Sequence, residues 1–190
     1  LQERVEIFKD IEPVIPSPLL RETLAENIPL ALEIDTEKAR SELIIAPVLV
    51  EVRKQFNRQI SFFSGVDFNV DRSRGLTGRC DFIISSSPKQ LEITAPVITL
   101  VEAKNDNIKS GIAQCIAEMV AAQLFNHQHR NAIKHVYGVI TTGSNWKFLR
   151  LVDKRVDIEA EEHFIGDLEA LFGIFLSMIK LASSQVESTD

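Results

Sequence analysis

Residues 97–104 read Val97-Ile98-Thr99-Leu100-Val101-Glu102-Ala103-Lys104, and this stretch decides the fold that we predict. It is rich in apolar and β-branched residues, which favour a buried strand. Because side chains alternate along a strand, Glu102 and Lys104 project from one face of the sheet and Val101 and Ala103 from the other. A carboxylate and an ammonium group are therefore expected to lie side by side where the strand ends.

The segments on either side of this strand predict a sheet covered by helices. Further strands are expected at residues 60–70, 76–85, 135–142 and 147–152, and helices at residues 36–56, 108–127 and 166–181. The strands at 60–70, 76–85 and 97–103 are predicted to form an antiparallel meander. The helix at 108–127 is amphipathic and is expected to pack on the sheet. The order α-β-β-β-α-β-β-α predicts an α/β (α+β) fold with a central mixed sheet flanked by helices.

The N-terminal segment, residues 1–35, is expected to be an irregular arm with a short helical run. It contains four prolines, each of which removes a backbone donor and restricts the residue before it. In the helix that follows, Pro47 should produce a kink or a break. We expect a single domain over residues 1–190, with the arm at 1–35, the core at 36–152 and an acidic helical segment at 153–190.

Composition is that of an ordinary globular domain, with 45% hydrophobic and 25% charged residues. The longest apolar stretches, residues 43–50 and 170–179, are far shorter than the roughly 20 residues that cross a bilayer, so no membrane span is expected. Cys80 and Cys115 lack metal-ligand spacing and are predicted to be small core residues in a reducing compartment. A cytoplasmic location follows from this interpretation.

The net charge of −6 is distributed unevenly along the chain. Residues 38–156 carry 17 Lys and Arg and 10 Asp and Glu, or +7, while residues 1–37 and 157–190 carry −6 and −7. An acidic total is therefore compatible with a cationic central surface, which a phosphate-binding protein needs locally. The simpler interpretation is that charges happen to fall unevenly along the chain.

Asp81 is a candidate partner for Glu102. Its strand continues into apolar residues, so its carboxylate is expected to be partly buried and compensated by a cation or a metal. If the two strands are neighbours, two carboxylates and the Lys104 ammonium lie close together. Such hard oxygen ligands suit Mg²⁺, or Mn²⁺. Taken singly, each residue is more simply explained as a solvent contact or a local ion pair.

The spacing of these residues resembles that of a known family. Asp81, then about twenty residues, then Glu-x-Lys at 102–104 and a helix bearing Gln114 resembles the PD-(D/E)XK nuclease superfamily with its restriction-endonuclease-like core. The nearest likeness is to the nuclease region of type I restriction enzyme motor subunits. The matching pieces are Glu37, Ile45-Ala46-Pro47-Val48-Leu49, Gly78-Arg79-Cys80-Asp81, Val101-Glu102-Ala103-Lys104, Gln114 and Thr141-Thr142-Gly143. Cys80 replaces a proline of the family pattern, and Glu118 replaces a frequent aromatic residue.

The resemblance implies Mg²⁺-dependent hydrolysis of phosphodiester bonds in DNA. Asp81 and Glu102 would hold the metal, with the carbonyl of Ala103 as a third protein ligand. The metal would polarise the scissile phosphate and lower the pKa of a bound water. Lys104 would orient or help to activate that water and stabilise the developing charge.

Further candidate residues each have two interpretations. Glu37 is either an outer metal or water ligand or a helix-start carboxylate favoured by the helix dipole. Gln114 either contacts the site or the DNA backbone or faces solvent. His127 and His129 could ligate a metal, but a polar C-terminal helix turn explains them more simply.

Two functions from different classes remain open. The first is a DNA nuclease, favoured by the intact set of Asp81, Glu102 and Lys104. The second is a non-catalytic domain of the same fold that binds nucleic acid or a protein partner. The lack of a recognisable DNA-reading or motor domain favours the second function, or a nuclease that works with a partner protein or a second copy of itself.

Overall fold

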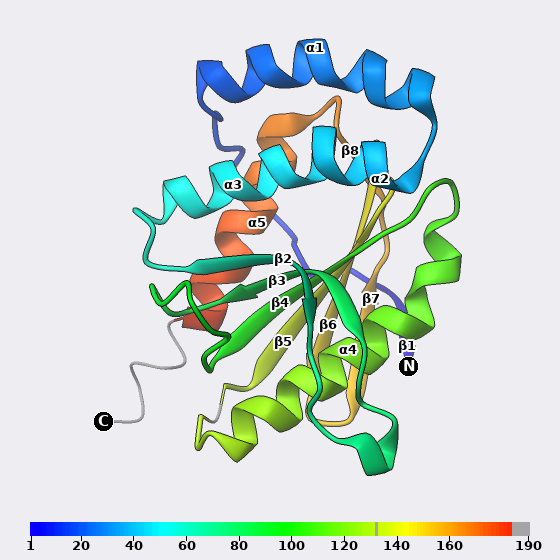
Figure 1. Cartoon of the computed structure of the whole chain (residues 1–190). Helices are drawn as coiled ribbons and strands as arrows, with labels where there is room; N and C mark the ends of the chain where they lie inside the picture. The colour runs from blue at the N-terminus through cyan, green and yellow to red at the C-terminus, as the bar shows by residue number, and fades with distance from the viewer. Residues whose placement is uncertain (132, 184–190) are drawn as a thin grey trace.

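The computed structural model describes residues 1–131 and 133–183, and its centre is a mixed eight-stranded β-sheet with helices on both faces (Figure 1). The strands are β1 (Gln2–Val5), β2 (Ser61–Asp67), β3 (Arg79–Ser85), β4 (Val97–Ala103), β5 (His135–Thr141), β6 (Asn145–Val152), β7 (Arg155–Glu159) and β8 (His163–Phe164). The helices are α1 (Pro18–Ile34), α2 (Glu37–Arg40), α3 (Ala46–Gln55), α4 (Ile108–Gln128) and α5 (Leu168–Ser183), with a π-helical turn η1 (Ser41–Ile45) and a 3-10 turn η2 (Arg72–Arg74).

The strand order across the sheet is β1-β7-β6-β5-β4-β3-β2, and β8 pairs with β6. Strands β2, β3 and β4 form the expected antiparallel meander, and β5 and β6 form the expected antiparallel pair. Strands β4 and β5 are parallel, and α4 makes the crossover that parallel neighbours require. The prediction of a mixed α/β fold with a central sheet flanked by helices is therefore confirmed.

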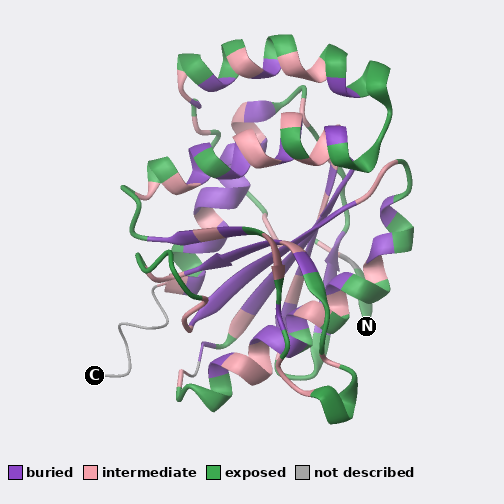
Figure 2. Ribbon diagram, viewed as in Figure 1, coloured by how far each residue is buried: buried purple, intermediate pink, exposed green. Residues whose placement is uncertain are grey.

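The helices form layers around the sheet (Figure 1). Helix α4 packs on β4, β5 and β6, whereas α3 contacts β2 and α5 contacts β4, β5 and α3. Helix α1 lies outside α2 and α3 as an additional layer. Figure 2 shows the strands buried between these layers, and every residue of β4 is buried. Cys80 and Cys115 are both buried and unpaired, which confirms that they are small core residues.

The N-terminal segment differs from the irregular arm that we predicted for residues 1–35. Its first residues form β1, which pairs in parallel with β7, and residues 18–34 form the full helix α1. Ser17 caps that helix by accepting from the Leu20 amide at 3.3 Å, and the next residue, Pro18, occupies the first helical turn, where its missing N–H costs nothing. Pro29 lies inside the helix, which therefore tolerates an interior proline.

Pro47 disrupts the regular α-helical hydrogen bonding, as the sequence predicts, but the chain stays helical on both sides of it. The π-helical turn η1 comes directly before α3, in which Pro47 lies in the first turn. Because Pro47 has no N–H, it cannot donate to the carbonyl of Leu43 as a regular α-helix would require. The side chain of Asn27 on α1 donates to that carbonyl at 2.8 Å, so α1 satisfies the group that the proline leaves unpaired.

The C-terminal part is also richer in strands than expected. Residues 153–190 were predicted to be a helical segment, of which 184–190 lie outside the described residues, yet in 153–183 strands β7 and β8 precede α5. Strand β7 is stabilised by partners on both sides, β6 and the remote β1. A strand that depends on residues more than 150 positions away is not visible in a local pattern, so this pairing was missed.

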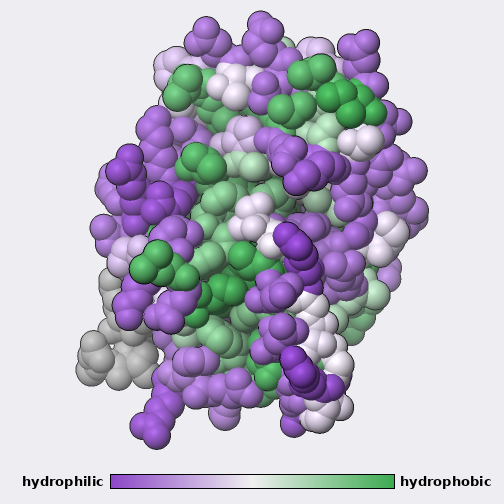
Figure 3. All heavy atoms as spheres, in the orientation of Figure 1, coloured by the Kyte–Doolittle hydropathy of each residue, from purple (hydrophilic) through white to green (hydrophobic). Residues whose placement is uncertain are grey.

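Helix α1 carries apolar side chains that the described residues leave exposed. They are Leu19, Leu30, Leu32 and Ile34. Figure 3 shows hydrophobic atoms gathered along the top of the molecule, where α1 lies. Within the described residues, none of the helices is both long enough and apolar enough to cross a membrane.

Candidate functional site

The site is built where strands β3 and β4 separate. Their last paired residues are Phe82 and Val101, and β3 then continues alone with β2. Asp81, the next residue of β3 beyond that pair, uses its side-chain Oδ2 to accept from the Ala103 amide at 2.8 Å. A side chain thus takes the place of a backbone ladder bond. This bond holds the Asp81 carboxylate at the end of β4, beside Glu102.

Glu102 is the centre of a hydrogen-bonded cluster, and only 1% of its side chain is exposed. The Lys104 ammonium donates to Glu102 Oε1, which confirms that these two side chains share one face. Gln114 of α4 donates through Nε2 to Glu102 Oε2 at 2.9 Å, and its Oε1 accepts from Lys104 Nζ at 3.5 Å. Gln114 is an exposed residue at the edge of the cluster. Its contacts nevertheless favour the interpretation as a site residue over a purely solvent-facing one.

Gly111 allows α4 to lie close enough for Gln114 to reach the cluster. A Cβ atom at this position would lie 2.8 Å from Ile140 Cγ2 and 3.2 Å from Lys104 Cε. Both distances are shorter than ordinary contacts between carbon atoms. The missing side chain therefore sets the spacing between α4 and the end of β4, and the Lys104 stem packs into the space it leaves.

The charges of the cluster act strongly on one another. Burial raises the pKa of Glu102, and the negative charge of Asp81 raises it further, although the Lys104 hydrogen bond acts in the opposite direction. Burial alone would lower the pKa of Lys104, but the hydrogen bond and charge of Glu102 outweigh it, so the pKa of Lys104 is raised. Lys104 is therefore an ammonium at neutral pH.

Glu37 lies near the cluster but is not bonded to it. It lines a pocket of about 270 Å³ together with Asp81, Ala103, Arg79 and Lys38. Its negative charge contributes to the raised pKa values of Glu102 and Lys104. The position, at the first turn of α2 after the N-cap Thr36, suits both interpretations of Glu37 given by the sequence. Two cationic side chains, Arg79 and Lys38, therefore border the carboxylates.

Glu118 is a site residue that the sequence analysis treated only as a departure from the family pattern. Its Oε1 accepts from Gln114 Nε2 at 3.2 Å, so one amide group joins Glu118 to Glu102. Burial raises the pKa of Glu118 to about 8, with a further contribution from the charge of Glu102. The signal in the sequence was the spacing of four residues from Gln114, which places both side chains on one helix face.

The donor set fits a divalent cation of the Mg²⁺ type. Among residues 1–131 and 133–183, no three Asp, Glu, His or Cys side chains are grouped so as to hold a metal together. Mg²⁺, however, usually takes one or two carboxylates and completes its coordination with water and substrate phosphate. The mutual repulsion of Asp81 and Glu102, visible in the raised pKa of Glu102, is what a bound cation would relieve.

Comparisons of the chain with models of known protein families, with curated proteins and with solved structures found no match.

The raised pKa of Glu118 predicts a specific dependence of stability on pH. Between pH of about 4.5 and about 8 the unfolded chain has released this proton while the folded chain keeps it, so this group makes stability fall as pH rises. Glu118→Gln keeps the acceptor for Gln114 and removes the titration. The melting temperature of the variant is expected to equal that of the parent near pH 4.5 and to exceed it increasingly toward pH 8.

Thermal melts of parent and variant across this pH range measure the effect. Glu92→Gln, in an exposed loop, is the matched control and should melt like the parent at every pH. A constant difference between Glu118→Gln and the parent over the whole range would contradict a raised pKa.

Proposed function

We propose that this chain is a nuclease domain of the PD-(D/E)XK type, with a restriction-endonuclease-like core, that hydrolyses phosphodiester bonds of DNA in the presence of Mg²⁺ or Mn²⁺. One observation carries the proposal. One connected cluster joins Asp81 of β3, Glu102 of β4 and Gln114 of α4. Lys104, the residue directly after β4, belongs to the same cluster. The succession of an antiparallel meander, a crossover helix and a parallel strand supports the same assignment.

Asp81 and Glu102, with the carbonyl of Ala103, would hold the metal. When bound, the metal supplies polarisation of the scissile phosphate and a water of lowered pKa. Binding of a divalent cation compensates the two carboxylates, and Gln114 is then the neutral group that keeps Glu102 in place. Glu37, which lines the same pocket as Asp81 and Ala103, would orient water at the outer side.

Lys104 acts in this proposal as a positive charge rather than as a base. Its raised pKa keeps it protonated at neutral pH, so it has no lone pair with which to accept a proton from water. An ammonium next to the reacting phosphate stabilises the negative charge that develops in the transition state. It also orients the attacking water by donating a hydrogen bond to it.

The test is cleavage of linear, circular and single-stranded DNA with and without Mg²⁺. We expect the parent to cut at least one of these substrates only when Mg²⁺ is present. Asp81→Ala should lose the cleavage and also the rise in melting temperature that Mg²⁺ causes in the parent, because a metal ligand is gone. Asp67→Ala, at the exposed end of β2, is the matched control and should behave like the parent.

A non-catalytic domain of this fold is the second candidate, and one observation favours it. Both oxygens of Glu102 already have partners within the chain, Lys104 and Gln114, so the cluster is compensated without a metal. In that case the domain would bind nucleic acid or a protein partner. A folded parent that cuts none of the three DNA forms, and whose melting temperature does not respond to Mg²⁺, would establish this alternative over the nuclease.

A further inference from the structure

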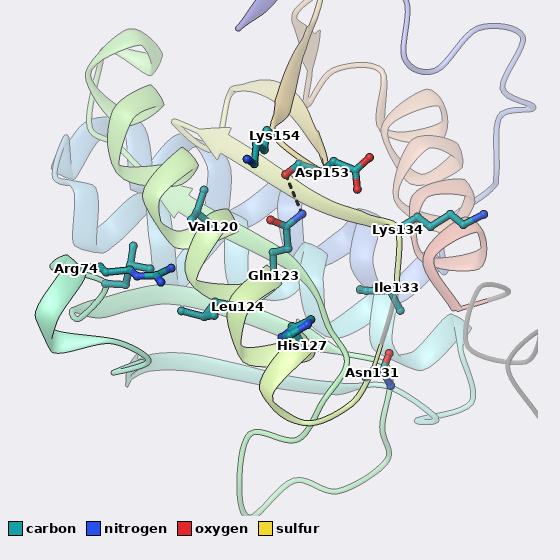
Figure 4. A pocket seen from close by; sticks show the side chains of 11 residues that line it. Arg74, Val120, Gln123, Leu124, His127, Asn131, Ile133, Lys134, Asp153 and Lys154 are labelled. Carbon is teal, nitrogen blue, oxygen red and sulfur yellow. Dashed lines mark hydrogen bonds between the residues drawn. The ribbon is translucent and has the colours of Figure 1, made fainter.

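A pocket of about 500 Å³ lies beside the C-terminal half of α4, outside the carboxylate cluster (Figure 4). Its apolar part comes from three segments that are far apart in the sequence: Leu76 after η2, Val120 and Leu124 on α4, and Ile133 before β5. Val120 is 37% exposed, so the apolar surface is open to solvent. A ligand with a flat apolar part could bury itself there.

Cationic side chains border this apolar surface. Figure 4 shows Val120 between Arg74, from the β2–β3 connection, and Lys154, from the β6–β7 turn, with Leu124 further along α4. Asp153 is the single acidic residue among the described residues that line the pocket, and its backbone carbonyl accepts from Gln123 Nε2 at 3.1 Å. Arg74 pairs through Nε with Asp71 at 3.3 Å, but 69% of its side chain is exposed. In a chain of net charge −6, this is a local surface suited to an anion.

The pocket also offers groups that recognise a planar ring. His127 supplies an imidazole at the exposed end of α4, and unpaired bases stack on such side chains. Asn131 and Gln123 add amide groups, which can donate to and accept from a base edge. An acidic peptide would also use the cations, so it serves as the competitor in the binding test.

A second, smaller pocket of about 220 Å³ has lining residues from both this region and the carboxylate cluster. It shares Leu76 with the larger pocket and is also lined by Gln114 and Glu118 of the cluster. Gln114 and His127 are 13 residues apart on α4, which corresponds to about 20 Å at 1.5 Å per residue. A DNA strand that passes both pockets would cover this length with about six nucleotides or fewer, at 3.4 Å each.

We propose that the larger pocket binds an unpaired nucleotide of the DNA strand whose phosphodiester bond lies at Asp81 and Glu102. The base lies on Val120 and Leu124 with the His127 ring beside it, and the flanking phosphates contact Arg74 and Lys154. The inference rests on the proposed nuclease function, because it names the form of DNA that the same site accepts: a strand that is single or locally unpaired on one side of the cut.

Binding is measured by fluorescence anisotropy with a labelled single-stranded oligonucleotide in EDTA, so that no cleavage takes place. Arg74→Ala/Lys154→Ala should weaken binding about tenfold, and the slope of log affinity against log salt should decrease by about 1.4, since each phosphate neutralised on a single strand contributes about 0.7. Arg72→Ala/Lys89→Ala is the matched control, because both residues are exposed and neither lines the pocket. It should stay within about twofold of the parent.

The apolar part is tested by Val120→Asn, with Val50→Asn on α3 as its control at a similarly exposed valine. Val120→Asn should weaken binding of the single-stranded oligonucleotide by about threefold or more. Binding of a blunt duplex should be unaffected, since only an unpaired base can enter the pocket. An equal loss for the duplex, or equal competition by an acidic peptide, would overturn the proposal in favour of a phosphate surface or a protein partner. Melting temperatures establish that each variant is folded.

The two proposals fail separately. If the pocket variants weaken binding but the parent never cuts DNA with Mg²⁺, the nuclease function is wrong and nucleotide binding holds. If the parent cuts DNA and the pocket variants bind as their controls do, the pocket assignment is wrong and the nuclease function holds.

Discussion

Lys104→Ala is expected to lower the rate of Mg²⁺-dependent DNA cleavage by about 100-fold or more, while DNA affinity changes by about threefold or less. In the proposed nuclease, the ammonium acts on charge that develops in the transition state, so its loss affects the reaction more than the binding of the substrate. The proposed metal ligands, Asp81 and Glu102, are unchanged in this variant. Single-turnover cleavage rates and binding measured in EDTA give the two quantities.

Two further variants make this result interpretable. Lys104→Met keeps the aliphatic stem that packs against Gly111 and removes only the charge, so it should be as slow as Lys104→Ala. Lys180→Ala, exposed near the end of α5, should cut like the parent. In a non-catalytic domain both Lys104 variants would instead lower the melting temperature, because Glu102 would remain buried without its cation. A large drop in melting temperature with no cleavage by the parent would contradict the catalytic role.

Gly138→Ala is expected to reduce the free energy of unfolding by about 1–3 kcal/mol through overpacking. A Cβ atom at this position of β5 would lie 2.5 Å from Met119 Sδ and 2.6 Å from Cys115 Sγ. Both sulfur atoms belong to buried side chains on α4, so the helix has to move away from the sheet or both side chains have to change rotamer. Urea denaturation of parent and variant measures the difference.

Gly166→Ala is the matched control, because no atom of the described residues, apart from its two chain neighbours, lies within 4 Å of the added Cβ. Its stability should be close to that of the parent. Equal stabilities for Gly138→Ala and the parent would mean that α4 is not tightly packed on β5. Because α4 carries Gln114 and Glu118, the Gly138→Ala variant should also cut DNA more slowly than the control, even at temperatures where it is folded.

Some of the site was predictable from local patterns. The alternation of a strand is a short-range property, so the shared face of Glu102 and Lys104 followed from their spacing, and the ion pair has that geometry. The helical spacing of apolar residues likewise located α4 within one residue of its observed end. The strands of Asp81 and Glu102 were expected to be neighbours because strands that are consecutive in the chain usually pair.

Other parts depend on residues that are remote in sequence. Asp81 reaches the end of β4 because the ladder between β3 and β4 stops at Phe82, and alternation along β3 alone does not show where a ladder stops. Pairing of β1 with β7, which lies about 150 residues away, needs the whole sheet to be assembled first.

By itself, the sequence determined which residue types occur at strand and helix spacing, and therefore the succession of the central elements from β2 to β6 and the charged pair at the end of β4. The tertiary structure alone decided that Gln114 and Glu118 join that pair, because the closeness of α4 to the sheet depends on the absence of side chains at Gly111 and Gly138. It also decided the raised pKa of Glu118, since burial is a property of the assembled layers. Periodicity is a property of neighbouring residues, whereas desolvation and close approach arise only when remote segments pack together.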